Sequence, residues 1–169
     1  AYTEATAWQY RFFVPHDVNG MIQLFGGKEE FVAALDDIFN TDAEIHGNLV
    51  DITGLIGQYV HGNEPSHHIA YLYNYVGEPW KTQKMSRRLL NEMYHPTPEG
   101  IIGNEDCGQM SAWYILSSMG LYSVCPGSNE YVLTTPLFEK VVVHLANGRT
   151  LTILANDPQK NIYITKVEL

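Results

Sequence analysis

Cysteine, positive charge and long apolar runs are all scarce in this sequence. Its two cysteines, Cys107 and Cys125, exclude the dense disulfide framework of a small secreted scaffold, although one bridge could form. No apolar segment approaches the ~20 residues of a transmembrane helix, so no membrane span is expected. The 10 Lys and Arg face 19 Asp and Glu, which gives a net charge of -9. Nucleic acids and anionic membranes attract basic surfaces, so neither is expected as a partner.

The composition is otherwise that of an ordinary globular domain with a substantial core. Hydrophobic residues make up 45% of the 169 residues and aromatic residues 12%. The aromatic residues include 11 Tyr and 3 Trp, whose rings can lie against a sugar and whose polar tips can bind a hydroxyl. Most of them are nevertheless expected to serve packing. Composition alone therefore leaves carbohydrate binding open.

Glycine and proline divide the first two-thirds of the chain into segments with helical periodicity. The expected helices cover residues 3–13, 17–25, 28–40, 66–76 and 109–119, with a further helix opened by Pro79. Closely linked helices of this kind form antiparallel pairs. The 109–119 segment is apolar nearly all round, which predicts burial between neighbours.

After Pro126 the apolar period changes from that of a helix to that of a strand. Residues 141–145 and 150–154 flank Asn147-Gly148, a strong signal for a two-stranded hairpin. Residues 161–169 are expected to form one more strand, and the bare edge at Leu169 suggests that the natural chain continues. The expected fold is mainly α, with helical hairpins over 1–125 and a truncated strand segment over 126–169.

A first cluster of polar residues stands where a helix is expected to begin. Its three imidazoles and carboxylate would suit zinc, but no recognised zinc spacing occurs, and His67 and His68 point in different directions on a helix. Asn63 or Glu64 could instead simply cap the helix ahead of Pro65. The cluster is His61-Gly62-Asn63-Glu64-Pro65-Ser66-His67-His68.

A second polar cluster also leads into a helix. Its adjacent carboxylates, Glu105 and Asp106, repel one another, which is typical of exposure to solvent, of a bound cation or of hydrogen bonds to a ligand. Together with the amides of Asn104 and Gln109 they are the oxygen ligands that calcium prefers, although the spacing is not that of an EF-hand. The cluster is Gly103-Asn104-Glu105-Asp106-Cys107-Gly108-Gln109-Met110-Ser111-Ala112-Trp113.

The two clusters offer carboxylates at the same end of neighbouring helical hairpins. Hydrolysis of a glycoside needs two carboxylates across the sugar, one to protonate the leaving oxygen and one to activate water or attack carbon. A carboxylate at a helix start is favoured in its ionised form, whereas a general acid must keep its proton. Burial and a neighbouring carboxylate are expected to outweigh that effect and to raise the pKa of such a carboxyl group.

Both clusters, with several other segments, closely resemble glycoside hydrolase family 92. The resemblance covers essentially the whole chain, and its two long motifs are highly specific. It lies in residues 4–10, 13–17, 61–68, 71–83, 103–113 and 126–128. The resemblance implies an N-terminal β-sandwich followed by an (α/α)6 barrel with further strands. This chain would then be the later barrel hairpins and part of the following sheet, without the sandwich.

The resemblance also implies a function. Family 92 enzymes are calcium-dependent α-mannosidases, which suggests removal of terminal α-linked mannose, preferably α-1,2-linked, from glycans such as N-glycans, with inversion of configuration. The implied partners are mannose-containing glycans and the remainder of the parent chain, and the implied location is periplasmic or secreted. Two other functions remain open: a different helical-toroid glycosidase, and a non-catalytic carbohydrate-binding or structural fragment.

Roles for individual residues follow from the resemblance. Glu64 occupies the position of the general acid, and the catalytic base is either Asp106 or an aspartate beyond Leu169. The resemblance places Ca2+ binding at the second cluster, through Asn104, Glu105 and Gln109. Several aromatic and polar residues are candidates for contact with the sugar, each of which could instead serve packing or capping. These are Trp8, His16, Asp17, Asn63, His67, His68 and Trp113.

Overall fold

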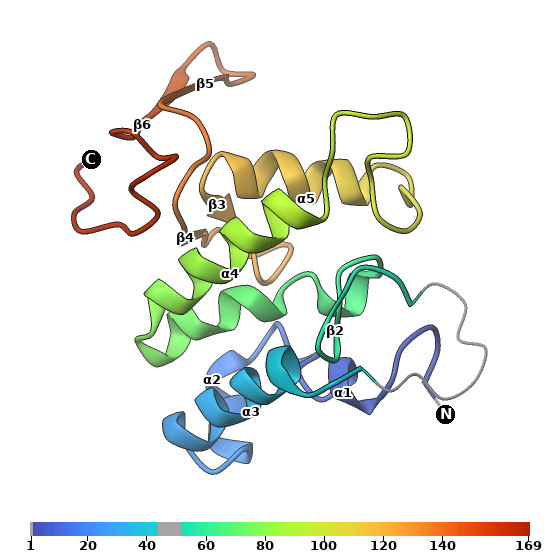
Figure 1. Cartoon of the computed structure of the whole chain (residues 1–169). Helices are drawn as coiled ribbons and strands as arrows, with labels where there is room; N and C mark the ends of the chain where they lie inside the picture. Colours follow the sequence, from blue (N-terminus) through green and yellow to red (C-terminus); the bar gives the residue numbers. More distant parts are fainter. Residues whose placement is uncertain (1, 44–51) are drawn as a thin grey trace.

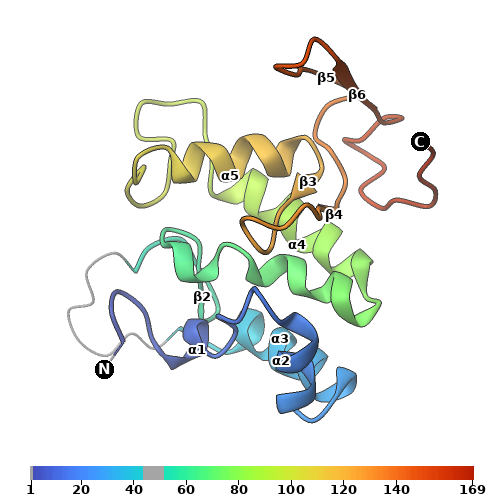
Figure 2. The same ribbon diagram turned by 180° about the vertical axis from the view of Figure 1, so that it is seen from behind.

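The computed structural model describes residues 2–43 and 52–169. Its elements succeed one another through space much as they do in the sequence (Figures 1 and 2). The first three helices lie at one end, α4 crosses the middle, α5 lies beyond it and a β-hairpin stands at the far end. Within the described ranges no helix is long and apolar enough to cross a membrane.

Helices and short antiparallel strands make up the fold. The helices are α1 (Ala7–Tyr10), α2 (Val18–Leu24), α3 (Lys28–Asn40), the 3₁₀ helices η1 (Glu64–Ser66) and η2 (Ile69–Val76), α4 (Pro79–Glu92) and α5 (Gln109–Ser118). The strands pair as β1 (Leu55–Ile56) with β2 (Tyr59–Val60), β3 (Leu121–Tyr122) with β4 (Val132–Leu133), and β5 (Lys140–His144) with β6 (Thr150–Leu154).

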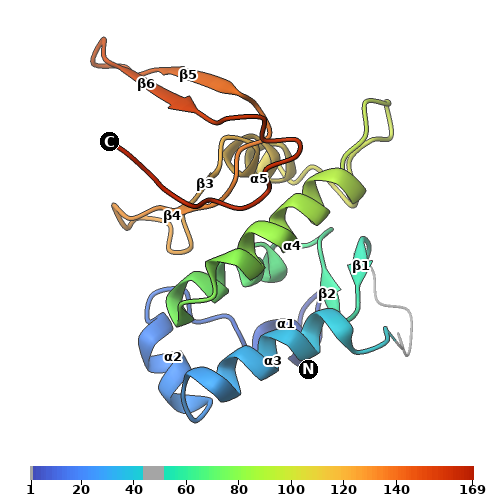
Figure 3. The same cartoon turned by 60° about the vertical axis from the view of Figure 1, so that its left-hand side comes forward.

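The core is built around η2, which packs against α3 on one side and α4 on the other (Figure 3). Six of the eight residues of η2 are buried, because neighbours cover it on several sides. The α3 helix contributes the apolar face expected from its sequence, Phe31, Leu35, Ile38 and Phe39, all of which are buried. A single apolar cluster therefore extends from Phe12 to Val124.

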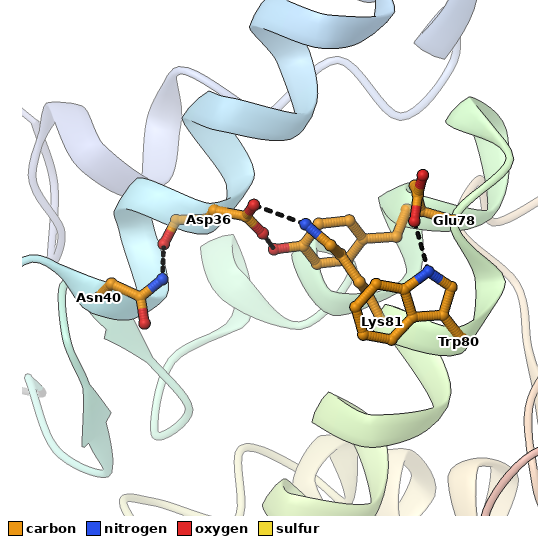
Figure 4. A network of polar contacts seen from close by, with 6 residues as sticks. Asp36, Asn40, Glu78, Trp80 and Lys81 are labelled. Atoms are coloured by element: carbon orange, nitrogen blue, oxygen red, sulfur yellow. Dashed lines mark hydrogen bonds and ion pairs between the residues drawn. The ribbon is translucent and has the colours of Figure 1, made fainter.

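Polar contacts at the edge of this core join α3 to η2 and α4 (Figure 4). The carboxylate of Asp36 accepts a hydrogen bond from the Tyr73 hydroxyl at 2.9 Å and forms an ion pair with Lys81 at 2.5 Å. On the same side of α4, the indole N–H of Trp80 donates to the Glu78 carboxylate. Burial and the nearby Asp36 charge raise the pKa of Tyr73, so its hydroxyl stays a donor.

Several expected elements are confirmed. Asp17 caps α2 by accepting from the backbone N–H of Gly20 at 2.8 Å, and α3 has the bounds expected of it. Pro79 opens α4 as its first residue. The hairpin of β5 and β6 forms around Asn147-Gly148, with Val142 opposite Thr152. The division at residues 125 and 126 stays a prediction, although β3 and β4 pair across it.

Four expectations were wrong. The first helix covers only Ala7–Tyr10, because Thr6 caps it and Glu4 has a left-handed φ of 53° that a helix cannot include. The expected 66–76 helix is of the 3₁₀ type and starts at Ile69. The α5 helix is not buried all round, since Ile115 is 55% exposed. Within the described chain, residues 161–169 form no strand, because their groups bond Gln83 and Thr135 side chains instead of a neighbouring strand.

Candidate active site

Glu64 lies at the start of η1, where the chain turns from β2 into the buried helix η2. Asn63 precedes it with an extended backbone, and its side-chain oxygen accepts from the Glu64 N–H at 3.2 Å. The amide group of Asn63 donates to the Glu4 carbonyl at 2.7 Å, which ties the N-terminal segment to the same turn. Asn63 therefore acts as a buried cap that holds the partly buried Glu64 in place.

Asp106 lies in a tight left-handed loop ahead of α5. Asp106, Cys107 and Gly108 have consecutive positive φ values of 50°, 57° and 96°. Such a backbone is costly for residues other than glycine, and strain of this kind gathers at functional sites. The Glu105 carboxylate stabilises the loop, because it accepts from both the backbone N–H and the hydroxyl of Ser111, at 3.0 and 2.8 Å.

The Glu64 and Asp106 side chains meet and share a hydrogen bond. Two carboxyl groups can do so only when one of them carries a proton. Partial burial is the largest effect and raises the pKa of Glu64. A backbone N–H lowers this pKa, but the charge of Asp106, the hydrogen bond to Asp106 and the charge of Glu4 raise it, so the net shift is upward. The expected direction of the shift is confirmed. The shift favours the protonated form of Glu64, which is the form that a general acid requires.

Close contact between two backbones brings these carboxyl groups together. A Cβ atom on Gly103 would lie 2.6 Å from the Gly62 carbonyl oxygen and 2.9 Å from its Cα. Gly103 also has a φ of 75°, a conformation that glycine adopts without strain. The two polar clusters thus touch through their glycines. This contact requires glycine at Gly103, whereas at Gly62 a Cβ atom would lie 2.0 Å from the Thr53 hydroxyl oxygen.

His67 links the two clusters by its side chain and its backbone. Its Nδ1 accepts from the Gln109 amide at 3.1 Å, and its Nε2–H donates to the His61 carbonyl at 2.8 Å. One turn after Gln109, the Trp113 indole N–H donates to the His67 carbonyl at 3.0 Å. Burial lowers the pKa of His67 to about 4, which leaves the ring neutral and Nδ1 free to accept.

His61 lies in a second set of buried polar contacts. Its Nδ1 is 2.9 Å from the Tyr59 hydroxyl, and its Nε2 is 2.8 Å from the Tyr94 hydroxyl. The Tyr94 hydroxyl also donates to the Met110 carbonyl at 3.2 Å, in the first turn of α5. Burial lowers the pKa of His61 to about 3, with a smaller contribution from His67.

The remaining predicted sugar contacts are placed unevenly. Trp113 is 1% exposed, with its ring parallel to Tyr94, so the structure places it in the core. His68 is also buried, and its Nε2–H donates to the Phe12 carbonyl at 2.8 Å, while burial lowers its pKa. Trp8 lies in α1, which contacts η1. The central carbon of the Arg11 guanidinium lies 4.4 Å from the centre of the Trp8 ring. His16 and Asp17 are exposed at the start of α2.

The structure therefore gathers Asn63, Glu64, His67, Asp106 and Gln109 into one site. It leaves His16 and Asp17 at the cap of another helix, and their contact with sugar stays a prediction.

The predicted calcium donors do not form a closed site. Both Glu105 oxygens are engaged by Ser111, and the Gln109 amide nitrogen is directed to His67. Within residues 2–43 and 52–169, no three His, Cys, Asp or Glu side chains gather in a way that could hold a metal ion. Oxygen donors of the right kind are present, but six to eight of them are needed for calcium.

Sequence reasoning missed the supporting tyrosines, Tyr59 and Tyr94, and the carboxylate of Glu4. No sequence signal identifies the two tyrosines, since a tyrosine whose hydroxyl bonds a histidine has the same local pattern as one that packs in a core. The short β1–β2 hairpin that positions Tyr59 was also missed, although Gly57-Gln58 between apolar pairs is compatible with a turn.

Comparisons with known proteins find similar sequences and similar structures. The family model described as the glycosyl hydrolase family 92 catalytic domain matches residues 1–169. An uncharacterized secreted glycosidase of Arthroderma benhamiae is 33% identical over 170 residues, which cover 98% of this chain and 20% of that protein.

Two solved structures from Bacteroides thetaiotaomicron are also similar. A family GH92 α-mannosidase in complex with mannoimidazole is 44% identical, with a TM-score of 0.85, over 90% of this chain and 20% of that one. A family GH92 inverting mannosidase is 39% identical, with a TM-score of 0.77, over 92% of this chain and 22% of that one. The chain thus spans about a fifth of the length of these relatives.

Proposed function

Because the chain belongs to glycoside hydrolase family 92, we propose that the whole protein hydrolyses terminal, non-reducing α-linked mannose from glycans. Solved relatives at 44% and 39% identity are named α-mannosidase and inverting mannosidase, which supports mannose as the sugar and inversion as the outcome. We further propose an α-1,2 linkage and N-glycans as the natural substrate class. The observation that carries the proposal is the contact between Glu64 and Asp106, which raises the pKa of the Glu64 carboxyl group.

Glu64 is the proposed general acid. Its carboxyl group would donate a proton to the glycosidic oxygen as the bond to the anomeric carbon breaks. Asn63 fixes the backbone on one side of Glu64, and the His67 N–H fixes it on the other by donating to the Glu64 carbonyl. The remaining candidate sugar contacts would orient the mannose so that its glycosidic oxygen reaches the acid.

The base must lie farther from the acid than Asp106 does. An inverting enzyme separates its two carboxyl groups by about 6.5–9.5 Å to leave room for the attacking water. Asp106 shares a hydrogen bond with Glu64, so as base it would first have to move away. The same contact suits Asp106 to a different task, the maintenance of a proton on Glu64. We therefore favour an aspartate beyond Leu169 as the base.

The proposed parent protein would be completed by parts outside this chain. An (α/α)6 barrel would accommodate these helices among further hairpins, and an N-terminal β-sandwich would precede them. The fungal relative is named a secreted glycosidase, which supports an extracellular or periplasmic location. We propose the same location for the parent protein.

Calcium is part of the proposal only with ligands from outside residues 1–169. Asn104, Glu105 and Gln109 would contribute some of the oxygens, and the ion would supply a charge that engages sugar hydroxyls when bound. We expect thorough chelation to abolish mannose release by the full-length protein and calcium to restore it. Full activity after chelation would remove calcium from the proposal.

Replacement of Glu64 in the full-length protein tests the proposed acid. Glu64→Gln keeps size and hydrogen bonding but removes the transferable proton. General acid catalysis is worth about 10²–10⁴ in rate, so we expect a loss of that size in kcat on an α-1,2-mannobiose. An activated aryl mannoside needs little protonation and should lose far less.

Glu78→Gln is a matched control, since Glu78 also stands at a helix start, that of α4. It should leave both substrates unaffected. Equal losses on both substrates for Glu64→Gln, together with a lower melting temperature, would show that Glu64 only caps the helix. Absence of mannose release by the wild-type protein would favour a non-catalytic role or another glycosidase specificity.

A further inference from the structure

One hydroxyl group, that of Tyr94, connects the two segments that carry the carboxyl pair. It lies 2.8 Å from Nε2 of His61, three residues before Glu64, and 3.2 Å from the carbonyl oxygen of Met110, four residues after Asp106. The Tyr94 backbone also pairs with Ile101, just ahead of Gly103. Tyr94 therefore contacts the entry to both clusters without belonging to either.

The direction of each hydrogen bond in this set is fixed. The Met110 carbonyl can only accept, so the Tyr94 hydroxyl donates to it, and His61 must donate from Nε2 to the Tyr94 oxygen. Nδ1 of His61 is then an acceptor, and the Tyr59 hydroxyl donates to it at 2.9 Å. Every ring nitrogen and hydroxyl hydrogen has one partner in this arrangement. A neutral His61 is the state that satisfies it.

This set of contacts is buried, which makes an unmade hydrogen bond expensive. Tyr59 and His61 are both 0% exposed, and the Tyr94 ring lies parallel to Trp113. Buried donors and acceptors that lose a partner cost about 1–3 kcal/mol, so the structure around them shifts to recover one. Loss of the Tyr94 hydroxyl would remove the acceptor for His61 Nε2–H and the side-chain donor to the Met110 carbonyl.

Any such shift would reach Glu64 by a short route. The His61 carbonyl accepts from His67 Nε2–H, and the N–H of His67 donates to the Glu64 carbonyl at 3.1 Å. On the other side, the N–H of Met110 donates to the Glu105 carbonyl at 3.3 Å, next to Asp106. The positions of both carboxyl groups thus depend on groups that Tyr94 binds directly.

We propose that Tyr94 is a positioning residue for catalysis, which acts through His61 and Met110 to hold Glu64 and Asp106 in register. The inference rests on the proposed function, because it concerns the placement of the proposed acid. Tyr94 touches neither carboxyl group in this arrangement, and Tyr59 supports it from the far side of His61. A displacement of about 1 Å can cost about 100-fold in rate, so a single remote hydroxyl can matter.

The test is the Tyr94→Phe variant of the full-length protein. We expect kcat on an α-1,2-mannobiose to fall about 10- to 100-fold with little change in KM, because binding groups stay in place while the acid is misaligned. An activated aryl mannoside, whose leaving group needs little protonation, should lose much less. Tyr59→Phe removes only the hydrogen bond to Nδ1 of His61. It should therefore show the same difference between the two substrates, with a smaller loss of kcat. It also carries the test if Tyr94→Phe fails to fold.

Tyr73→Phe is the matched control. It too removes a hydroxyl that bonds another element, since the Tyr73 hydroxyl donates to the Asp36 carboxylate of α3. That contact involves neither His61 nor Met110, the groups through which Tyr94 would act. We expect it to lower the melting temperature without changing the ratio of the two activities. If Tyr94→Phe and Tyr59→Phe behave as Tyr73→Phe does in an active enzyme, the inference is wrong while the proposed function stands. Failure of the wild-type enzyme to release mannose would overturn both.

Discussion

At the scale of single residues, the hydrogen bond between Glu64 and Asp106 separates the roles of two similar side chains. Glu64 is partly buried and follows a capping asparagine, whereas Asp106 is exposed on a left-handed loop. Burial, the charge of Asp106 and the hydrogen bond to Asp106 raise the pKa of the Glu64 carboxyl group, and together they outweigh the lowering effect of a backbone N–H. Environment, not residue type, therefore favours the protonated form of Glu64.

Asp106→Asn should change the pH dependence of the full-length enzyme. Glu64 must be protonated to act, so activity falls as pH rises through its pKa. The variant removes the charge that raises this pKa, and its amide can donate to ionised Glu64. Both effects lower the pKa, and the alkaline limb of kcat/KM against pH should move to lower pH.

Asp157→Asn is a suitable control, because Asp157 is another aspartate with positive φ, 45° against 50° for Asp106. Its pH profile should match that of the wild type. If Asp106→Asn instead abolished activity at every pH on every substrate, Asp106 would have to be the base.

The resemblance of the two motifs was enough to identify Glu64 as a candidate, but not to find the residues that support it. Tyr94 stands two residues after the end of α4, in a pattern that would suit simple packing. Its partner His61 was noted in the sequence only as one of three clustered imidazoles. The hydrogen-bond partners of Tyr94 depend on how β2, α4 and α5 pack together. The local sequence pattern does not indicate that packing.

At the scale of elements, sequence predicted best where periodicity and capping agree. The α3 and α4 helices have apolar faces and clear starting signals, and both formed as expected. Prediction failed where tertiary contacts decide. The η2 segment is a 3₁₀ helix buried on most of its surface, and the alternating residues 161–169 bond side chains of other elements. Alternation predicts a strand only when a partner strand is available.

Gly103→Ala should separate the two clusters and weaken the site. A new Cβ would meet the Gly62 backbone at 2.6 Å, which no rotation of a side chain can relieve. We expect a lower melting temperature and a loss of mannosidase activity in the full-length protein. Gly127→Ala is the matched control, since Gly127 has a φ of 90° but no atom within 4 Å of the new Cβ.

Gly127→Ala should be destabilised only by the strain of an alanine in a left-handed conformation, about 1–2 kcal/mol. Gly103→Ala should therefore be the less stable of the two variants, and it alone should lose activity beyond what its stability explains. Identical behaviour of the two variants would show that the contact between Gly62 and Gly103 does not hold the clusters together.

At the scale of the whole molecule, the chain is unevenly buried. The apolar core lies between Phe12 and Val124, where η2 is covered by α3 and α4. The β5–β6 hairpin instead exposes large apolar side chains, with Val142 at 41% and Leu154 at 73%. A cavity of about 750 Å³ opens between β6, residues 160–169 and the end of α5. An isolated two-stranded hairpin is marginally stable at best.

Amide hydrogen exchange should therefore differ between residues 1–169 alone and the full-length protein. In the isolated chain we expect the amides of β5 and β6 to exchange orders of magnitude faster than those of η2 and α4, because few buried apolar contacts resist opening there. Exposed Leu154 and Ile115, at 73% and 55%, also favour self-association of the isolated chain, which size-exclusion chromatography would detect. In the full-length protein, where further elements would cover these surfaces, the hairpin should gain protection while η2 changes little. Uniform protection across an isolated monomer would show instead that residues 1–169 form an independent cooperative unit.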